Sequence, residues 1–397
     1  MAYSSTLALP DVRGELGAGQ AHGRLVPLDG LRGIAVFLVI LFHWKFLPFG
    51  WSGVWLFFIL SGFFIFRNLV TIRQAKPSMP LRPFYGGFMY RRCMRLLPLY
   101  YLLLLVMAVV VAILARWDLL TYTVPGLALF LHNFVKPFST IKHSLYYDHF
   151  WSLGVEMHFY LLAPLLVFYL SMSRLKVVLA AIVVASPLLR GAAAAMLEAD
   201  ASWLTIKPGG FIYVLSFFHF DAFALGGLAA IYERSLVQLR ARAWWLLLVP
   251  GALFLAYGAY IALVHRDVPY QLFMSGHLQE SVGYTLLIMG CAGLVAVALV
   301  DRGLLRWFLT LPPLLLLGRI SYGVYLIHGA LIMLTFALWE TYFPGAGRFS
   351  PVVLGMFGIY LVVTIGIAWL SFTFYESRFL VHTKLPAQPL SAAPAVG

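Results

Sequence analysis

Residues 28–66, LDGLRGIAVFLVILFHWKFLPFGWSGVWLFFILSGFFIF, decide the fold of this chain. They contain two apolar runs of membrane-spanning length, joined by a short turn with proline and glycine. The first run carries Arg32 near one end and His43 near the other, eleven helical steps or ~16 Å apart. Charged and titratable side chains on a membrane helix are costly, so this pair indicates a functional site. The alternative interpretation is a snorkelling arginine and a hydrogen-bonded interhelical histidine.

The composition places the rest of the chain in a membrane as well. Of 397 residues, 62% are hydrophobic and 11% are charged, whereas about a quarter of the residues are charged in a soluble domain. We predict an all-α, polytopic transmembrane helix bundle over residues 27–382, in the cell membrane. Its ten spanning helices are expected at 31–48, 52–70, 96–115, 150–170, 177–195, 211–231, 244–263, 282–300, 320–339 and 351–373.

The basic residues predict the orientation of the bundle. With both termini in the cytoplasm, twenty of the 28 Lys and Arg residues lie inside and eight outside, as the positive-inside rule requires. The net charge of +13 therefore reports topology, and no nucleic-acid partner is needed to explain it. The run 119–134 contains Pro125 and is interpreted as a re-entrant or surface helix. The polar tail 1–26, without a cleaved signal peptide, and the Pro/Ala-rich tail 383–397 are expected to be disordered and cytoplasmic.

Seven motifs follow one another along the chain: LDGLRGIAVFLVILFH, GVWLFFILSGFFI, RRCMRLLPLYY, FWSLGVEMHFYLLAPLL, FDAFALGGLAAIY, LGRISYGVYLIH and FTFYESRFL. In this order they resemble the acyltransferase-3 family of integral membrane O-acyltransferases, over residues 26–380. The resemblance implies transfer of a short acyl group, most often acetyl, from acyl-CoA to a hydroxyl of a carbohydrate or glycosylated acceptor. Three places depart from the usual pattern of the family, namely Trp55, the pair Met157-His158, and His219.

The resemblance also implies catalytic residues, because the family's arginine–ten residues–histidine motif falls on Arg32 and His43. Acyl transfer needs a base for the proton of the attacking hydroxyl, and histidine suits this role near neutral pH. Glu156 is expected ~9 Å below the outer end of its helix, at the depth of His43, so the two can pair. Such a carboxylate would fix the histidine tautomer. Direct transfer is preferred, and a transient acyl-histidine is the alternative.

Arg91, Arg92 and Arg95 are candidates for donor binding, together with Arg32 at a similar depth. Acyl-CoA carries several phosphates, and arginine binds phosphate through charge-assisted, bidentate hydrogen bonds. Contact with anionic lipids at the inner face is the alternative role for a bare RRxxR group. Acyl-CoA, above all acetyl-CoA, is thus expected as a co-substrate, with no tightly bound cofactor and no metal site.

His328 and Tyr325 lie on one span and are candidates for lining the acyl or substrate path, with interhelical hydrogen bonding as the alternative. Asp29 is a third candidate, although a helix N-cap is the preferred interpretation. Asp221 is expected to be a structural partner of arginines or of backbone groups. The Ser61-Gly62 pair is interpreted as a place of close helix packing, and Ser61 is rejected as a nucleophile.

Two other functions fit parts of the sequence. A transporter or flippase for a polar or glycosylated substrate would also bury ionisable groups, but it predicts internal repeats. No clear repeat relates 28–170 to 211–373. An enzyme of the same chemistry could act on a cytoplasmic antibiotic sugar, and the sequence does not separate that acceptor from an envelope glycan. The acyl group and the oligomeric state also stay open.

Overall fold

The computed structural model describes residues 25–139, 147–266 and 279–380. Those residues form helices and their connections, and no strand occurs among them. The all-α prediction is therefore confirmed. Apart from Leu25 and Val26, the tails predicted at 1–26 and 383–397 lie outside the described residues.

Nine helices are long and apolar enough to cross a membrane, within the part of the chain that is described. A tenth span results if α9 (Pro208–Val214) and α10 (Phe220–Ile231), which meet at a bend of 73°, are counted together. This agrees with the predicted ten spans of a multi-pass membrane protein. The nine helices are α2 (Val26–His43), α3 (Ser52–Ala75), α4 (Leu81–Ile113), α7 (Trp151–Tyr169), α8 (Met172–Ala199), α12 (Arg240–Val264), α13 (Tyr284–Val300), α16 (Ser321–Tyr342) and α17 (Pro351–Ser371).

Short helices connect the long ones. The run 119–134 is divided into a π-helical turn (Leu119–Thr123) and the short helices α5 (Val124–Ala128) and α6 (His132–Val135), so it forms no single long helix. The others are α11 (Glu233–Gln238), α14 (Leu304–Leu309), α15 (Pro312–Arg319) and α18 (Ser377–Leu380), with 3₁₀ turns at Lys136–Phe138, Asp148–Phe150 and Ser216–His219 and π-helical turns at Gln279–Gly283 and Phe372–Glu376.

The first helix is displaced from its predicted range of 31–48. It begins at Val26 and ends at His43, because Lys45 adopts the left-handed conformation with φ of 57°. The amide of Phe46 then donates to the carbonyl of Leu41 at 2.9 Å, and the amide of Lys45 donates to the carbonyl of Phe42 at 2.8 Å. These two bonds form a Schellman motif, which satisfies the last carbonyls of the helix. His43 is consequently the last helical residue.

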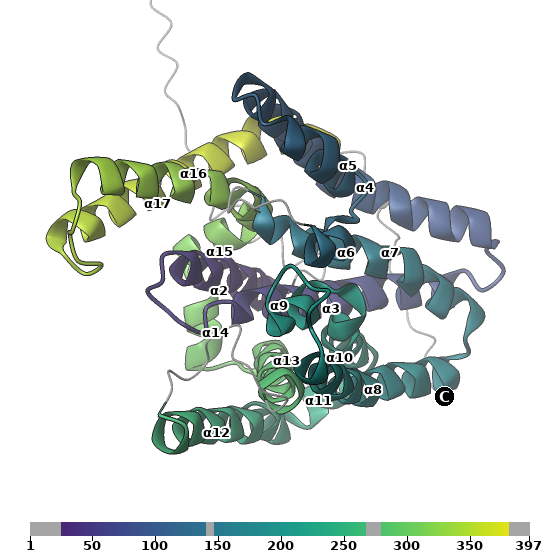
Figure 1. Ribbon diagram of the computed structural model, residues 1–397. Coiled ribbons are helices and arrows are strands. Elements are labelled where there is room, and N and C mark those ends of the chain that lie inside the picture. Colours follow the sequence, from purple (N-terminus) through teal and green to yellow (C-terminus); the bar gives the residue numbers. More distant parts are fainter. Residues whose placement is uncertain (1–24, 140–146, 267–278, 381–397) are drawn as a thin grey trace, which may run out of the picture.

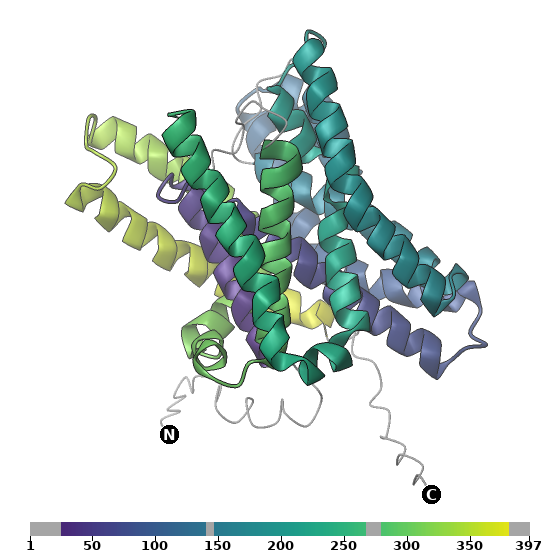
Figure 2. The ribbon, with the colours of Figure 1, turned by 90° about the horizontal axis from the view of Figure 1, so that it is seen from below.

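Helices α2 and α3 occupy the middle of the bundle (Figure 1). In that view α4, α5, α16 and α17 lie above them, and α8, α10, α12 and α13 lie below them. Seen from below, α8 and α12 are nearest the viewer (Figure 2). Helices α3 and α10 approach closely because both carry glycine at the crossing. A Cβ on Gly62 would lie 2.2 Å from the carbonyl oxygen of Phe223, and one on Gly226 2.0 Å from that of Ile59. The predicted packing role of Gly62 is confirmed.

The break between α9 and α10 leaves backbone carbonyls without helical partners, and side chains satisfy them. His219 donates from Nε2 to the carbonyl of Tyr213 at 2.8 Å, and Asn133 donates to that of Val214 at 3.2 Å. Arg190 donates to the carbonyl of Phe218 at 2.6 Å. Irregular backbone inside a membrane protein is tolerated where its polar groups are satisfied in this way.

Candidate functional site

A cavity of about 750 Å³ extends along α3, from Val54 near one end of that helix to Thr71 near the other. These residues are seventeen helical steps or ~25 Å apart, so the cavity is long and narrow. One end is lined by Arg67, Thr71 and Arg91, and the opposite end by Val54, Ser152 and Tyr325. The cavity can therefore receive an elongated molecule whose two ends meet different chemistry.

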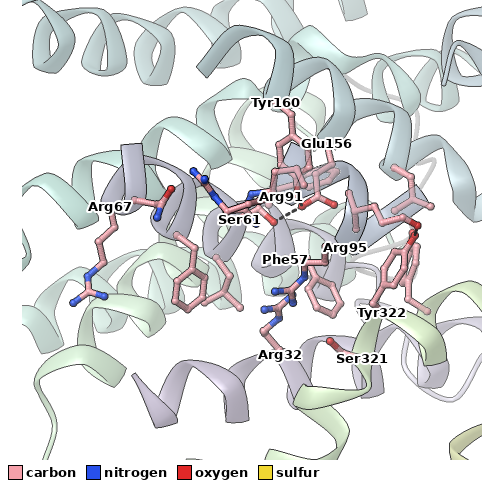
Figure 3. A pocket seen from close by; sticks show the side chains of 18 of the residues that line it. Arg32, Phe57, Ser61, Arg67, Arg91, Arg95, Glu156, Tyr160, Ser321 and Tyr322 are labelled. Carbon is pink, nitrogen blue, oxygen red and sulfur yellow. Dashed lines mark hydrogen bonds between the residues drawn. The ribbon is translucent and has the colours of Figure 1, made fainter. Parts of the chain in front are cut away.

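Besides Arg67, which pairs with Glu233 at 2.8 Å, four arginines line this cavity, namely Arg32 from α2 and Arg91, Arg92 and Arg95 from α4. The structure thus brings together the residues that the sequence nominated as a donor site. Arg32 and Arg95 lie side by side (Figure 3). In the described part of the chain, none of the four forms an ion pair with an acidic side chain. The Arg92 guanidinium instead stacks on the rings of Phe88 and Tyr160, at 5.5 and 5.4 Å. This concentration of unpaired positive charge is suited to an anionic ligand.

Glu156 lies in the wall of the same cavity (Figure 3). Its Oε1 accepts hydrogen bonds from the hydroxyls of Ser61 and Tyr160, both at 2.5 Å. Ser61 therefore does more than permit close packing, and the sequence reasoning missed it and Tyr160 as partners of the glutamate. The available signal was their polarity within apolar spans. The carboxyl group thus lies in a wall that carries five guanidinium groups.

A smaller cavity of about 190 Å³ adjoins the first one. It shares Asp29, Arg32 and Arg95 with the larger cavity and adds Arg319 and Glu376. Asp29 lies within the first turn of α2, whose N-cap position is occupied by Leu25, so the preferred N-cap interpretation was wrong. A helix that starts at Val26 places this carboxylate in the cavity wall instead.

His43 lies apart from the arginines, in a cluster of three histidines. Its ring centroid is 4.9 Å from that of His328 and 6.4 Å from that of His149. The rings of His149 and His328 are 4.4 Å apart. The sequence had nominated His43 and His328 separately, and it gave no reason to place His149 beside them. Among the described residues, no group of three or more His, Cys, Asp or Glu side chains is arranged to hold a metal ion.

The predicted pairing of His43 with Glu156 is wrong. The two side chains share no hydrogen bond in the described part of the structure; Glu156 accepts from Ser61 and Tyr160, and His43 Nδ1 donates to the carbonyl of Val39 at 2.8 Å. The reason is depth, because α2 ends at His43 rather than five residues later. The residue of the fourth span beside His43 is consequently His149, seven residues or ~10 Å before Glu156.

Ser152 and Tyr325 separate the cavity from the histidines. Both line the cavity, and their hydroxyls are 2.5 Å apart. The Tyr325 hydroxyl also donates to the carbonyl of His149 at 2.8 Å, and its ring centroid lies 5.5 Å from that of His328. The cavity therefore ends one layer of side chains away from the histidine cluster.

Away from the cavity, Asp221 has the structural role that was expected of it. It forms an ion pair with Arg190 at 2.8 Å, and both side chains are fully buried. Two departures from the family pattern also meet here, since Trp55 Nε1 donates to His219 Nδ1 at 2.9 Å. The third departure is the pair Met157-His158, where the His158 ring forms a hydrogen bond with the hydroxyl of Ser216 at 2.7 Å.

Residues 26–376 match the family described as an acyltransferase domain. The chain is 28% identical over 380 residues to the peptidoglycan O-acetyltransferase OatA of Listeria monocytogenes, covering 88% of this chain and 55% of that protein. It is 29% identical over 379 residues to the putative peptidoglycan O-acetyltransferase YrhL of Bacillus subtilis, covering 89% and 55%. It is 28% identical over 384 residues to the putative membrane-bound transacylase BcsY of Komagataeibacter xylinus, covering 93% and 88%. The chain thus spans about half the length of the first two relatives. No solved structure matches it significantly.

Proposed function

This chain belongs to the acyltransferase family that matches its residues 26–376, and from that premise we propose that it moves a short acyl group from acyl-CoA to a hydroxyl of a carbohydrate or glycosylated acceptor. Acetyl is the first acyl group to test. Two relatives are named as peptidoglycan O-acetyltransferases, so a cell-wall glycan is the first acceptor to test. The family match disfavours the alternative of a transporter or flippase.

The observation that carries the proposal is the convergence of Arg32, Arg91, Arg92 and Arg95 on one long cavity. The donor would place its phosphates against these guanidinium groups, which have no acidic partner among the described residues. Its thioester would then extend toward Ser152 and Tyr325, beyond which the histidines lie. Because acyl-CoA is made in the cytoplasm, this assignment requires the arginine end of the cavity to face that side.

His43 is the proposed general base. It takes the proton of the acceptor hydroxyl while the oxygen attacks the thioester carbon; the C–S bond then breaks and the thiolate of CoA leaves. The group that orients the imidazole is the carbonyl of Val39, which accepts from Nδ1 and leaves Nε2 with the lone pair. Glu156 belongs to the donor cavity in this proposal, where its negative charge partly balances the arginines.

The test separates donor binding from chemistry in the purified protein. Replacing Arg91, Arg92 and Arg95 together by Gln should weaken acetyl-CoA binding at least a hundredfold and reduce its salt dependence, because charge-assisted bonds are lost. The exposed Arg302→Gln variant is the matched control. Unchanged affinity in the triple variant would refute the donor site.

The same preparation tests the base. His43→Ala should still bind acetyl-CoA but should transfer acetyl to peptidoglycan fragments about 10² to 10⁴ times more slowly. Near-normal transfer by this variant would refute the role of His43. A wild-type protein that binds acetyl-CoA but acetylates no glycan would refute the proposed acceptor class.

A further inference from the structure

His328 has a buried nitrogen that forms no hydrogen bond to any residue the structure describes. The side chain is fully buried on α16, and its Nδ1 lies 2.6 Å from the carbonyl oxygen of Tyr325. A carbonyl only accepts, so Nδ1 carries the hydrogen and Nε2 of the neutral ring holds the lone pair. Within the described residues, that Nε2 has no hydrogen-bond partner. An unsatisfied buried polar atom is uncommon and calls for an explanation.

His43 is held by a backbone carbonyl in a similar way. Its Nδ1 donates to the carbonyl of Val39, so its Nε2 also holds a lone pair in the neutral state. The two rings are in contact, with centroids 4.9 Å apart and planes crossing at 65°. In the neutral state each of these contacting rings is thus held by a backbone carbonyl in the tautomer that leaves the lone pair on Nε2.

We propose that His328 is the positioning residue of His43 and shares the proton that His43 takes from the acceptor hydroxyl. This inference rests on the function proposed above. The acceptor O–H bond breaks as the new O–C bond forms, and the proton reaches His43 Nε2. The lone pair of His328 Nε2 then stabilises the imidazolium until the proton passes to the departing thiolate of CoA. No oxidant, metal or further reactant is needed.

Three polar groups near the pair have partners among the described residues. Asp148, which precedes the third histidine in sequence, is bound by Lys136 at 3.2 Å. The Tyr325 hydroxyl donates to the carbonyl of His149, and the Tyr360 hydroxyl donates to the carbonyl of His328 at 3.2 Å. In this proposal, the imidazole of His328 takes the place of the carboxylate that pairs with the base histidine in a hydrolase triad.

The test compares variants that fill the same space with and without a lone pair. His328→Met keeps the volume but removes the acceptor, and it should lower kcat about 10- to 100-fold while the KM for acetyl-CoA stays within about threefold. His328→Gln keeps a polar acceptor and should retain more activity than His328→Met. The exposed His265→Met variant is the control.

Each result decides between positioning and packing. If His328→Met transfers acetyl as fast as the wild type, His328 only fills space and the inference is overturned, while the proposed function stands. Should the Met variant not accumulate, His328→Gln is compared with the shorter His328→Asn. If His328→Gln retains activity and His328→Asn does not, the inference is supported. Equal activity of these two variants overturns it. Absence of transfer by the wild type overturns the proposed function instead.

Discussion

Replacing Arg190 by methionine should leave Asp221 buried without a counter-charge and should destabilise the whole bundle. Arg190 is 0% exposed and bonds to four other elements, namely α10, the 3₁₀ turn Ser216–His219, the π-helical turn Gln279–Gly283 and α13. It pairs with Asp221 on α10 at 2.8 Å and donates to the carbonyls of Phe218 and Glu280 at 2.6 and 2.8 Å. A further bond goes to the hydroxyl of Thr285 at 2.9 Å. One side chain therefore joins α8, the broken helix and α13.

The expected loss in the free energy of unfolding follows from the burial of both charges. Removing one partner of a buried ion pair costs about 3–5 kcal/mol, because the other charge stays desolvated. At about 1.4 kcal/mol per factor of ten, the unfolding equilibrium constant should rise by two to three and a half orders of magnitude. Replacing both residues by apolar ones of similar volume is often nearly neutral, so Arg190→Met/Asp221→Leu should recover much of the loss.

Reversible unfolding by SDS in mixed micelles, followed by circular dichroism, measures the free energy of unfolding. The exposed pair Arg116–Asp118, with side chains 49% and 42% exposed, supplies the control variant Arg116→Met, which should change stability little. A loss below about 1 kcal/mol in Arg190→Met would refute the reasoning. The reasoning would also be refuted if Arg190→Met/Asp221→Leu were as unstable as Arg190→Met.

Three further outcomes are expected. Gly226→Ala should separate α3 from α10 and lower stability by at least about 1 kcal/mol in the same unfolding assay, because its Cβ would lie 2.0 Å from the carbonyl oxygen of Ile59; unchanged stability would contradict the close crossing. Glu156→Gln should tighten acetyl-CoA binding by up to about tenfold, because it removes a carboxylate from the wall of the donor cavity, and two like charges ~12 Å apart repel by ~1.4 kcal/mol at an effective dielectric of 20; weaker binding in titration calorimetry would contradict this role. Reporter fusions at the C-terminus and in the loop at 200–207, between α8 and α9, should report opposite sides of the membrane, and matching answers would refute the predicted topology.

The sequence by itself determined the class of the protein and the position of its helices along the chain. Apolar runs of about twenty residues must become helices in a bilayer, because each backbone group then finds its partner within the same segment. The charged and titratable pair Arg32 and His43 also predicted a functional site on the first span. The local rule could not predict that α2 ends at His43, because the end depends on the left-handed conformation of Lys45.

Tertiary structure alone decided which polar residues meet. Matching depth suggested that Glu156 pairs with His43, whereas the rotation and depth of α7 place Glu156 against Ser61 of α3. Its other partner, Tyr160, lies four residues further along α7 itself. His149, which had no predicted role, lies against His328 instead. The physical reason is that a helix presents a different side chain every 100° of rotation. An end displaced by a few residues therefore changes every partner on the neighbouring helix, and no local pattern in the sequence records that displacement.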